Sequence, residues 1–281
     1  MIKREINDAA GLSGIECFLF DMDGTLYLGS DILPGALDLI DLLHSRGKKV
    51  VYITNNSSRS DADYVKKLND MGIKSSVDEF FSSADAIAHR LSEMMPGARL
   101  YVLGTDSLKD FLAECGFRIV EGYTQDPAEI PDFAVLGFDT SLTYEKLRIF
   151  CDYLTDGVRY IATHPDMVCP AEGHRSVPDA GSFMLLIEGA TGRRPELIAG
   201  KPGPAMINII TEKLGVEKSR TAVVGDRLNT DIMSGINAGT KTVCVLSGET
   251  DLAMLRRSDV TPDYVFDSVL EIYESLRHCG N

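Results

Sequence analysis

Short runs of almost wholly apolar residues recur along the chain, and stretches with helical periodicity separate them. Such runs lie at 15–20, 48–53, 221–224 and 241–246. Between them, apolar residues three and four positions apart indicate helices, for example at 36–43 and 205–214. Strands that are apolar on both faces occur in parallel sheets that helices cover on either side. The pattern therefore predicts an α/β fold built on a doubly wound parallel sheet.

The middle of the chain repeats this alternation on its own. Strands are predicted at 99–103, 133–136 and 158–162, and helices at 107–115 and 144–154. A segment of about 110 residues is long enough to fold as a domain. We therefore expect a discontinuous core, 1–83 and 195–281, with an inserted α/β domain at 84–194.

The charge balance excludes some classes of partner. The chain has 42 acidic and 28 basic residues and a net charge of −14. Proteins that bind nucleic acid or anionic membranes need net or clustered positive charge, so neither partner is expected. If the ligand is itself an anion, a cation or a local lysine must overcome the negative field of the protein.

No segment predicts export or membrane insertion. The segment 1–8 is too polar for a signal peptide, and the apolar run 183–187 is far shorter than the roughly 20 residues of a membrane span. The cysteines form no metal-binding or redox motif, so reduced thiols are expected. They are Cys17, Cys115, Cys151, Cys169, Cys244 and Cys279. We expect a soluble, cytoplasmic protein.

Two aspartates, Asp21 and Asp23, follow the first apolar run in the motif Asp-Met-Asp-Gly-Thr. In a turn at the end of a strand, both carboxylates can face one cavity. A polar turn with solvated acids is the alternative for an isolated motif of this kind. A calcium loop is excluded because Leu26 and Ile32 stand where such a loop needs Gly and Glu.

Two further motifs carry groups that suit an anion. Thr54-Asn55-Asn56-Ser57 ends the second apolar run and offers hydroxyl, amide and backbone N–H donors. Gly200-Lys201-Pro202 precedes a predicted helix, and Lys201 would point at whatever the sheet edge binds. Each motif is a weak signal alone, because loops rich in Asn and Ser and surface lysines are common.

The last motif brings the number of acids at strand ends to four. The apolar run 221–224 is followed by Gly225 and then Asp226, and Asp231 comes five residues after Asp226. Four crowded carboxylates repel one another unless a divalent cation neutralises them. Ligands that are all oxygen favour a hard ion, Mg²⁺ before Zn²⁺.

Together these motifs, in this order and at strand ends, resemble the haloacid dehalogenase superfamily of phosphotransferases. The sequences Asp23-Gly24-Thr25-Leu26-Tyr27-Leu28-Gly29, Thr54-Asn55-Asn56-Ser57-Ser58 and Gly200-Lys201-Pro202 are similar to those of its p-nitrophenyl-phosphatase-like and NagD-like subgroup. The resemblance covers almost the whole chain. It implies a Rossmann-like core, and it implies that the insertion at 84–194 is the cap domain of this superfamily.

The resemblance also implies roles for the acids and the lysine. Mg²⁺ would be held by Asp21, Asp226 and the backbone carbonyl of Asp23, and Asp231 would orient the site or bind the ion through water. Lys201 and Thr54 would bind the phosphoryl oxygens. Asp21 would attack phosphorus to form an aspartyl-phosphate, and Asp23 would act as general acid and then general base.

The core motifs surround only the phosphoryl group, so the cap is expected to recognise the rest of the substrate. The family often has Thr-Asn-Pro-Asp where this chain has Thr163-His164-Pro165-Asp166. We expect His164 and Asp166, together with Asn55 and Asn56, to bind substrate; an ordinary turn is the alternative.

The expected function is Mg²⁺-dependent hydrolysis of small phosphate monoesters, such as sugar, polyol or nucleotide phosphates. A phosphotransferase or mutase would use the same intermediate, and a non-catalytic phosphometabolite-binding regulator is a further alternative. A receiver-type signalling domain would need neither Asp23 nor the insertion. The expected partner is a small phosphorylated metabolite, and a homodimer is left open as the oligomeric state.

Overall fold

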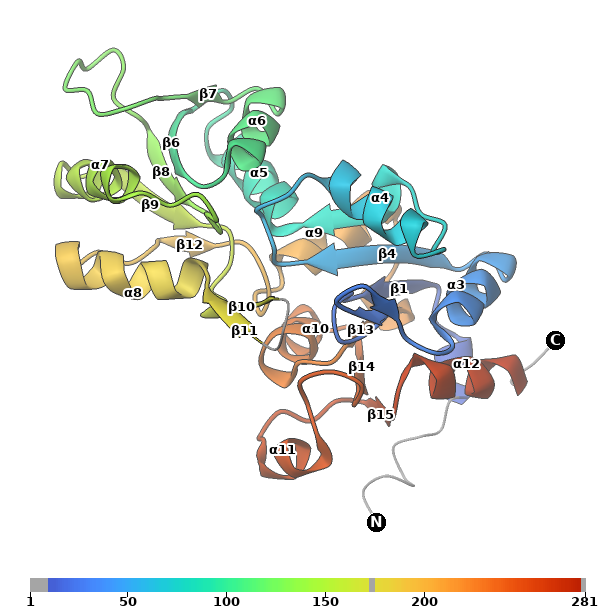
Figure 1. Ribbon diagram of the computed structural model, residues 1–281. Helices are drawn as coiled ribbons and strands as arrows, with labels where there is room; N and C mark the ends of the chain where they lie inside the picture. The colour runs from blue at the N-terminus through green and yellow to red at the C-terminus, as the bar shows by residue number, and fades with distance from the viewer. Residues whose placement is uncertain (1–9, 172–174, 279–281) are drawn as a thin grey trace. The chain divides into compact units, whose positions relative to one another are not determined.

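The computed structural model describes residues 10–171 and 175–278, and the contacts between residues divide the chain into two compact units (Figure 1). The first unit comprises Met1–Thr54, Tyr64–Phe81 and Lys201–Asn281, and the inserted unit comprises Asn55–Asp63 and Ser82–Gly200. The polar segment 1–8 and Cys279 lie outside the described residues.

The first unit is built on a six-stranded sheet in the order β15-β14-β13-β1-β4-β5. The pairings from β15 to β4 are parallel, as predicted from the apolar runs. The strands in this order are Tyr264–Phe266, Lys241–Val245, Thr221–Gly225, Cys17–Phe20, Lys49–Thr54 and Phe80–Ser82. The short strands β2 (Tyr27–Leu28) and β3 (Asp31–Ile32) form a separate antiparallel pair.

Strand β1 is buried along its whole length because it lies between β13 and β4. Phe18 and Phe20 pack with Tyr52 and Val224 in the core of this unit. Helices α3 and α12 pack against each other (Figure 1), and the contacts between residues pack α9 against α10. The helices are α2 (Ala10–Ser13), α3 (Ala36–Ser45), α4 (Asp61–Asp70), α9 (Ala205–Leu214), α10 (Met233–Ala238), α11 (Leu252–Arg257) and α12 (Val269–His278), with short helical turns η1 (Val77–Glu79), η2 (Lys218–Arg220) and η3 (Leu228–Ile232).

The inserted unit has a five-stranded parallel sheet of its own, in the order β12-β9-β8-β6-β7. Tyr101, Phe150, Tyr153 and Tyr160 form an aromatic cluster in its core. The strands in this order are Leu197–Ile198, Arg159–Ala162, Phe133–Leu136, Arg99–Leu103 and Arg118–Ile119. The helices are α5 (Ser83–Met94), α6 (Asp106–Glu114), α7 (Tyr144–Thr155) and α8 (Ala180–Thr191), and β10 (Val168–Ala171) pairs with β11 (Arg175–Pro178) as an antiparallel hairpin.

The contacts place Asn55–Asp63 in the inserted unit, although this segment was expected in the core, and they put the other edges at Ser82 and Gly200 instead of at 84 and 194. At the C-terminal edge, β12 pairs with β9, so the chain stays in the second sheet until Ile198 and in the inserted unit until Gly200. At the N-terminal edge, Ser82 accepts a hydrogen bond from the backbone of Asp85 and caps α5. Two-residue strands and caps of this kind leave almost no periodic signal, so the sequence placed these edges a few residues away.

Among the described residues, no helix is both long enough and apolar enough to cross a bilayer.

Candidate active site

Asp21 is the first residue after β1, where the central strand of the first sheet ends. Its backbone N–H donates to the carbonyl of Val224 on the neighbouring strand at 2.8 Å. The chain then turns at Gly24, whose φ of 87° is a conformation that glycine adopts without strain. The side chain of Ser247 donates to the Gly24 carbonyl at 2.8 Å. These bonds fix the turn that carries Asp21 and Asp23.

Asp226 follows β13 and is tightly enclosed. Its Oδ2 accepts the backbone N–H of Glu249 at 2.7 Å. A Cβ atom at Gly24 or at Gly248 would lie 2.5 Å or 2.1 Å from the same oxygen. Glycine at both positions lets two loops approach this carboxylate, which is only 2% exposed.

Asp231 lies in η3, a π-helical turn between Asp226 and α10. Such turns occur often at functional sites because the extra residue changes the direction of a side chain. Its Oδ2 accepts the backbone N–H of Arg227 at 3.1 Å. Gly225 leaves the room that Asp231 fills, since a Cβ there would lie 2.3 Å from the Cβ of Asp231.

Lys201 joins two of these acids. Its buried ammonium donates to Asp21 and to Asp231, at 2.6 Å in both cases. Oxygens of Asp21, Asp226 and Asp231 all lie within 4.8 Å of one another. The structure thus brings together four of the side chains that the sequence placed at one edge of the sheet.

Thr54 and Asp23 also lie in the first unit. Thr54 is the last residue of β4, the strand that pairs with β1. Asp23 is exposed, and its backbone forms an isolated β-bridge with Tyr27, the first residue of β2. Both residues therefore come from the segments that follow or end the neighbouring strands β1 and β4.

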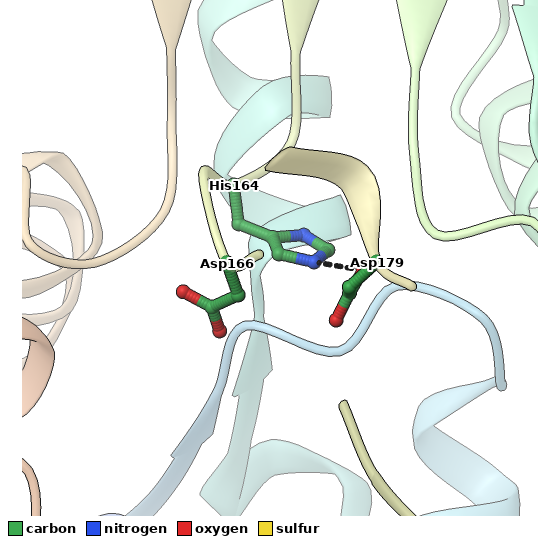
Figure 2. A group of neighbouring side chains, drawn as sticks. All are labelled: His164, Asp166 and Asp179. Atoms are coloured by element: carbon green, nitrogen blue, oxygen red, sulfur yellow. Dashed lines mark hydrogen bonds and ion pairs between the residues drawn. The ribbon is translucent and has the colours of Figure 1, made fainter. Parts of the chain in front are cut away.

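The other predicted residues lie in the inserted unit. Asn55 donates to the carboxylate of Asp166 at 3.1 Å, and Asn56 lies 3.9 Å from the thiol of Cys169. His164 is buried, and its Nε2 lies 2.9 Å from Asp179. Figure 2 shows the ring of His164 joined to Asp179, with the carboxylate of Asp166 turned to the other side.

Two family models match this chain. The model described as haloacid dehalogenase-like hydrolase matches residues 18–118, and a second one, described as HAD-hydrolase-like, matches residues 198–272. The chain belongs to the haloacid dehalogenase-like hydrolases. The two matched segments contain every acid of the site and Lys201.

Curated and solved relatives of this hydrolase carry phosphatase names. An acid sugar phosphatase of Staphylococcus aureus is 37% identical over 93% of this chain and 98% of its own length. The structure of a 4-nitrophenylphosphatase from Thermotoga maritima has a TM-score of 0.88 at 45% identity and covers 94% of this chain and 98% of its own. A glycerol phosphate phosphatase from Mycobacterium tuberculosis, solved in complex with magnesium, has a TM-score of 0.85 at 27% identity, covering 93% of this chain and 77% of its own. The hydrolase is an enzyme of the NagD-like phosphatase subgroup.

The charges in the site of this hydrolase are not balanced by the protein alone. Burial and the neighbouring Asp231 raise the pKa of Asp21 to about 8 and that of Asp226 to about 6. Burial lowers the pKa of Lys201, but Asp21 and Asp231 outweigh it and raise that pKa overall. Lys201 and Arg227 are the cations beside these three carboxylates, and Arg227 also pairs with Glu249, so negative charge is left for a further cation to neutralise.

The donor set fits a divalent metal ion. Three carboxylates with oxygens inside 4.8 Å are the hard ligands that Mg²⁺ prefers. The raised pKa values show the cost of gathering these groups without a cation, and a bound ion would remove that cost.

The groups that hold the site residues in place leave no clear signal in the sequence. Ser247 and Glu249 bind the Gly24 turn and Asp226 from a loop after β14. Asp179 binds His164 although it lies 15 residues further along the chain. An Asp directly before a predicted helix is an N-cap signal, and Asp179 does cap α8, but nothing in the sequence pairs it with His164.

Proposed function

We propose that this hydrolase is a Mg²⁺-dependent phosphatase of small phosphate monoesters that works through a phosphorylated Asp21. The contact of Lys201 with both Asp21 and Asp231 carries the proposal. It places a buried cation beside the carboxylate that attacks, where the negative charge of a phosphoryl group has to be stabilised.

The proposed metal ligands are Asp21, Asp226 and the backbone carbonyl of Asp23, with Asp231 orienting the site or binding through water. When bound, the ion supplies positive charge that neutralises phosphoryl oxygens. The close approach of the three carboxylates supports this assignment, and a relative solved with magnesium suggests which ion it is.

In the first half-reaction an oxygen of Asp21 attacks phosphorus, and the bond from phosphorus to the ester oxygen breaks. Lys201 and Thr54 bind the phosphoryl oxygens that do not react. Asp23 gives its proton to the departing ester oxygen. The products are an alcohol and an acyl phosphate on Asp21.

In the second half-reaction Asp23, now ionised, takes a proton from water, and that water attacks phosphorus. The bond between phosphorus and Asp21 breaks, so inorganic phosphate leaves and the carboxylate is restored. A phosphotransferase or mutase would use a substrate hydroxyl in place of this water. The hydrolase family and its phosphatase-named relatives support water as the acceptor, and they argue against a non-catalytic regulator.

We propose sugar or polyol phosphates as the substrate class, with nucleotides as the alternative. The names of the Staphylococcus and Mycobacterium relatives support this choice. Asn56 and Asp166 of the inserted unit are the proposed contacts to the organic part, since Asn55 holds one oxygen of Asp166 and the half-buried carboxylate can accept a hydroxyl with the other. The cytoplasm stays the proposed compartment on the sequence grounds given above.

Phosphate release from a panel of monoesters tests the proposal. The panel contains p-nitrophenyl phosphate, glycerol phosphates, sugar phosphates, nucleotides, phosphoglycolate and pyridoxal phosphate, each with Mg²⁺. We expect release from p-nitrophenyl phosphate and the highest kcat/KM on a sugar or polyol phosphate. No release from any member would reject the function, and a preference for nucleotides would reject the substrate class.

A further inference from the structure

The chain crosses from one unit to the other at several points. At three of these crossings, residues on the inserted-unit side contact the same loop. The first crossing follows Thr54, the third precedes Ser82, and the last follows Gly200. Asn55, Ser83 and Gly200 all contact the segment 163–166, which we name the junction loop. Two of these crossings adjoin Thr54 and Lys201, the residues proposed to bind phosphoryl oxygens.

Gly200 lies directly against the junction loop. Its N–H donates to the carbonyl of Thr163 at 2.6 Å. A Cβ atom at Gly200 would lie 2.5 Å from Oδ1 of Asn55, 2.8 Å from the Thr163 carbonyl oxygen and 2.9 Å from Cβ of His164. Asn55 of the first crossing and residue 200 of the last can therefore lie this close together only if residue 200 is glycine.

Asn55 is held from two sides. Its side chain donates to Asp166, and its backbone carbonyl accepts the hydroxyl of Ser83 at the start of α5. Ser83 is also 3.5 Å from Nδ1 of His164. The hydroxyl of Ser83, whose proton is donated to the Asn55 carbonyl, therefore links the third crossing to the first.

His164 links the junction loop to the start of α8. Its Nε2 lies 2.9 Å from a carboxylate oxygen of Asp179, and its Nδ1 lies 2.9 Å from the hydroxyl of Thr163. Both ring nitrogens have partners in the inserted unit, which leaves neither for a substrate.

We propose that the junction loop is a positioning element for catalysis. It holds Asn55 and Gly200 against each other, and His164 anchors the loop to Asp179. In this way it fixes the chain ends that lead to Thr54 and Lys201. The proposal rests on the proposed function, because it assigns those two residues to the phosphoryl group.

A wedge variant tests the proposal without removing any functional group. Gly200→Ala should force Asn55 and Thr163 apart, and displacements near 1 Å can cost about 100-fold in rate. We expect kcat to fall about 10- to 100-fold on every active phosphate of the panel, including p-nitrophenyl phosphate, which has no hydroxyl for Asp166 to bind. The control is Gly189→Ala in α8, where an added Cβ meets nothing within 4 Å, and it should keep wild-type kinetics.

A second pair of variants covers the case in which Gly200→Ala does not fold. His164→Gln can still reach Asp179, because its amide lies where Nε2 was, whereas His164→Ala cannot. We expect His164→Ala to lower kcat on every active phosphate of the panel, p-nitrophenyl phosphate included, and His164→Gln to restore most of it. Faster hydrogen exchange at the amide of residue 200 should accompany the loss, since that N–H depends on Thr163.

Three results would overturn the proposal. Wild-type kcat in Gly200→Ala would show that the spacing is irrelevant, and a loss in His164→Ala that spares p-nitrophenyl phosphate would show that the loop acts on the organic part of the substrate instead. A metal bound in stoichiometric amount and lost in His164→Ala would assign His164, Asp166 and Asp179 to a metal site, which their clustering also permits. If wild type releases no phosphate, the proposed function fails, and exchange at residue 200 still tests whether the loop holds the crossings.

Discussion

The ammonium of Lys201 lies 2.6 Å from a carboxylate oxygen of Asp21, the residue that we propose as nucleophile. This contact keeps Asp21 oriented before substrate arrives. An arriving phosphoryl group offers Lys201 other oxygens to bind, so the lysine can pass from the nucleophile to the group under attack. In the proposed mechanism the ammonium of Lys201 would therefore bind the nucleophile at rest and the phosphoryl group during the reaction.

Removing the nucleophile should abolish turnover. Asp21→Asn keeps the shape of the side chain, but an amide does not attack phosphorus, so we expect no steady-state phosphate release above background. Asp41→Asn, an exposed acid on α3, is the matched control and should keep wild-type kcat. Retained turnover in Asp21→Asn would place the nucleophile elsewhere.

Removing the general acid should cost rate in proportion to the need for protonation. Asp23→Asn should lower kcat about 10²- to 10⁴-fold on alkyl phosphates, the usual range for a lost acid or base. The loss should be smaller on p-nitrophenyl phosphate, whose leaving group needs less protonation. Steady-state kinetics on both substrates measure the difference. Equal losses would mean that Asp23 does not protonate the leaving oxygen.

Chelation should stop the reaction reversibly. We expect EDTA to abolish phosphate release and added Mg²⁺ to restore it. Asp226→Asn should raise the Mg²⁺ concentration for half-maximal activity by at least about tenfold, because one anionic ligand becomes neutral. Titration of Mg²⁺ in both proteins measures the shift. Full activity after exhaustive EDTA treatment would contradict the metal assignment.

Asp166 should affect which phosphate is preferred. Asp166→Asn keeps an oxygen for Asn55 but removes the negative charge offered to a substrate hydroxyl. We expect kcat/KM to fall on sugar and polyol phosphates and to change little on p-nitrophenyl phosphate, which has no hydroxyl to bind. An unchanged ranking across the panel would make the segment 163–166 a turn without substrate contacts.

One ion pair predicts a pH dependence of stability. The side chain of Arg99 donates to both oxygens of Asp132, and its backbone N–H donates to one of them. The Arg99 side chain holds the pKa of Asp132 below its ordinary value, against the effect of burial. A carboxyl with a lowered pKa stabilises the fold above its unfolded pKa and loses this effect as the pH falls through the folded value.

Asp132→Asn should therefore lower the melting temperature at pH 7. The difference from wild type should shrink as the pH falls below about 4, where the wild-type carboxyl also begins to lose its charge. Thermal denaturation between pH 2 and pH 7 measures this. Glu129→Gln removes an exposed carboxylate nearby and serves as the control. A difference that does not depend on pH would assign the effect to packing.

Much of the site could be predicted because strand ends are visible in sequence. Asp21 and Asp226 are 205 positions apart, yet both follow apolar runs that the structure pairs side by side as β1 and β13. Parallel strands end at one edge, so polar residues after them must meet there. The strands predicted from apolar runs at 99–103 and 133–136 are confirmed at the same residues.

Features that depend on single hydrogen bonds could not be predicted. The strand β15 has three residues, and β12 has two, which is too short for a periodic signal. The pairing of His164 with Asp179 depends on how a hairpin returns the chain to the start of α8. The enclosure of Asp226 by Gly24 and Gly248 is likewise a matter of loop geometry, which residue types alone leave open.

The two parallel sheets share no strand within the described residues, and each contributes to its own core, which contains several aromatic residues. Cooperative unfolding extends only as far as packing and hydrogen bonds are continuous. Calorimetry should therefore record two overlapping heat-absorption peaks, one for each sheet. Replacing Phe150, which is fully buried in the inserted unit, should move only one of them. A single midpoint fitted to such a trace describes neither half of the molecule.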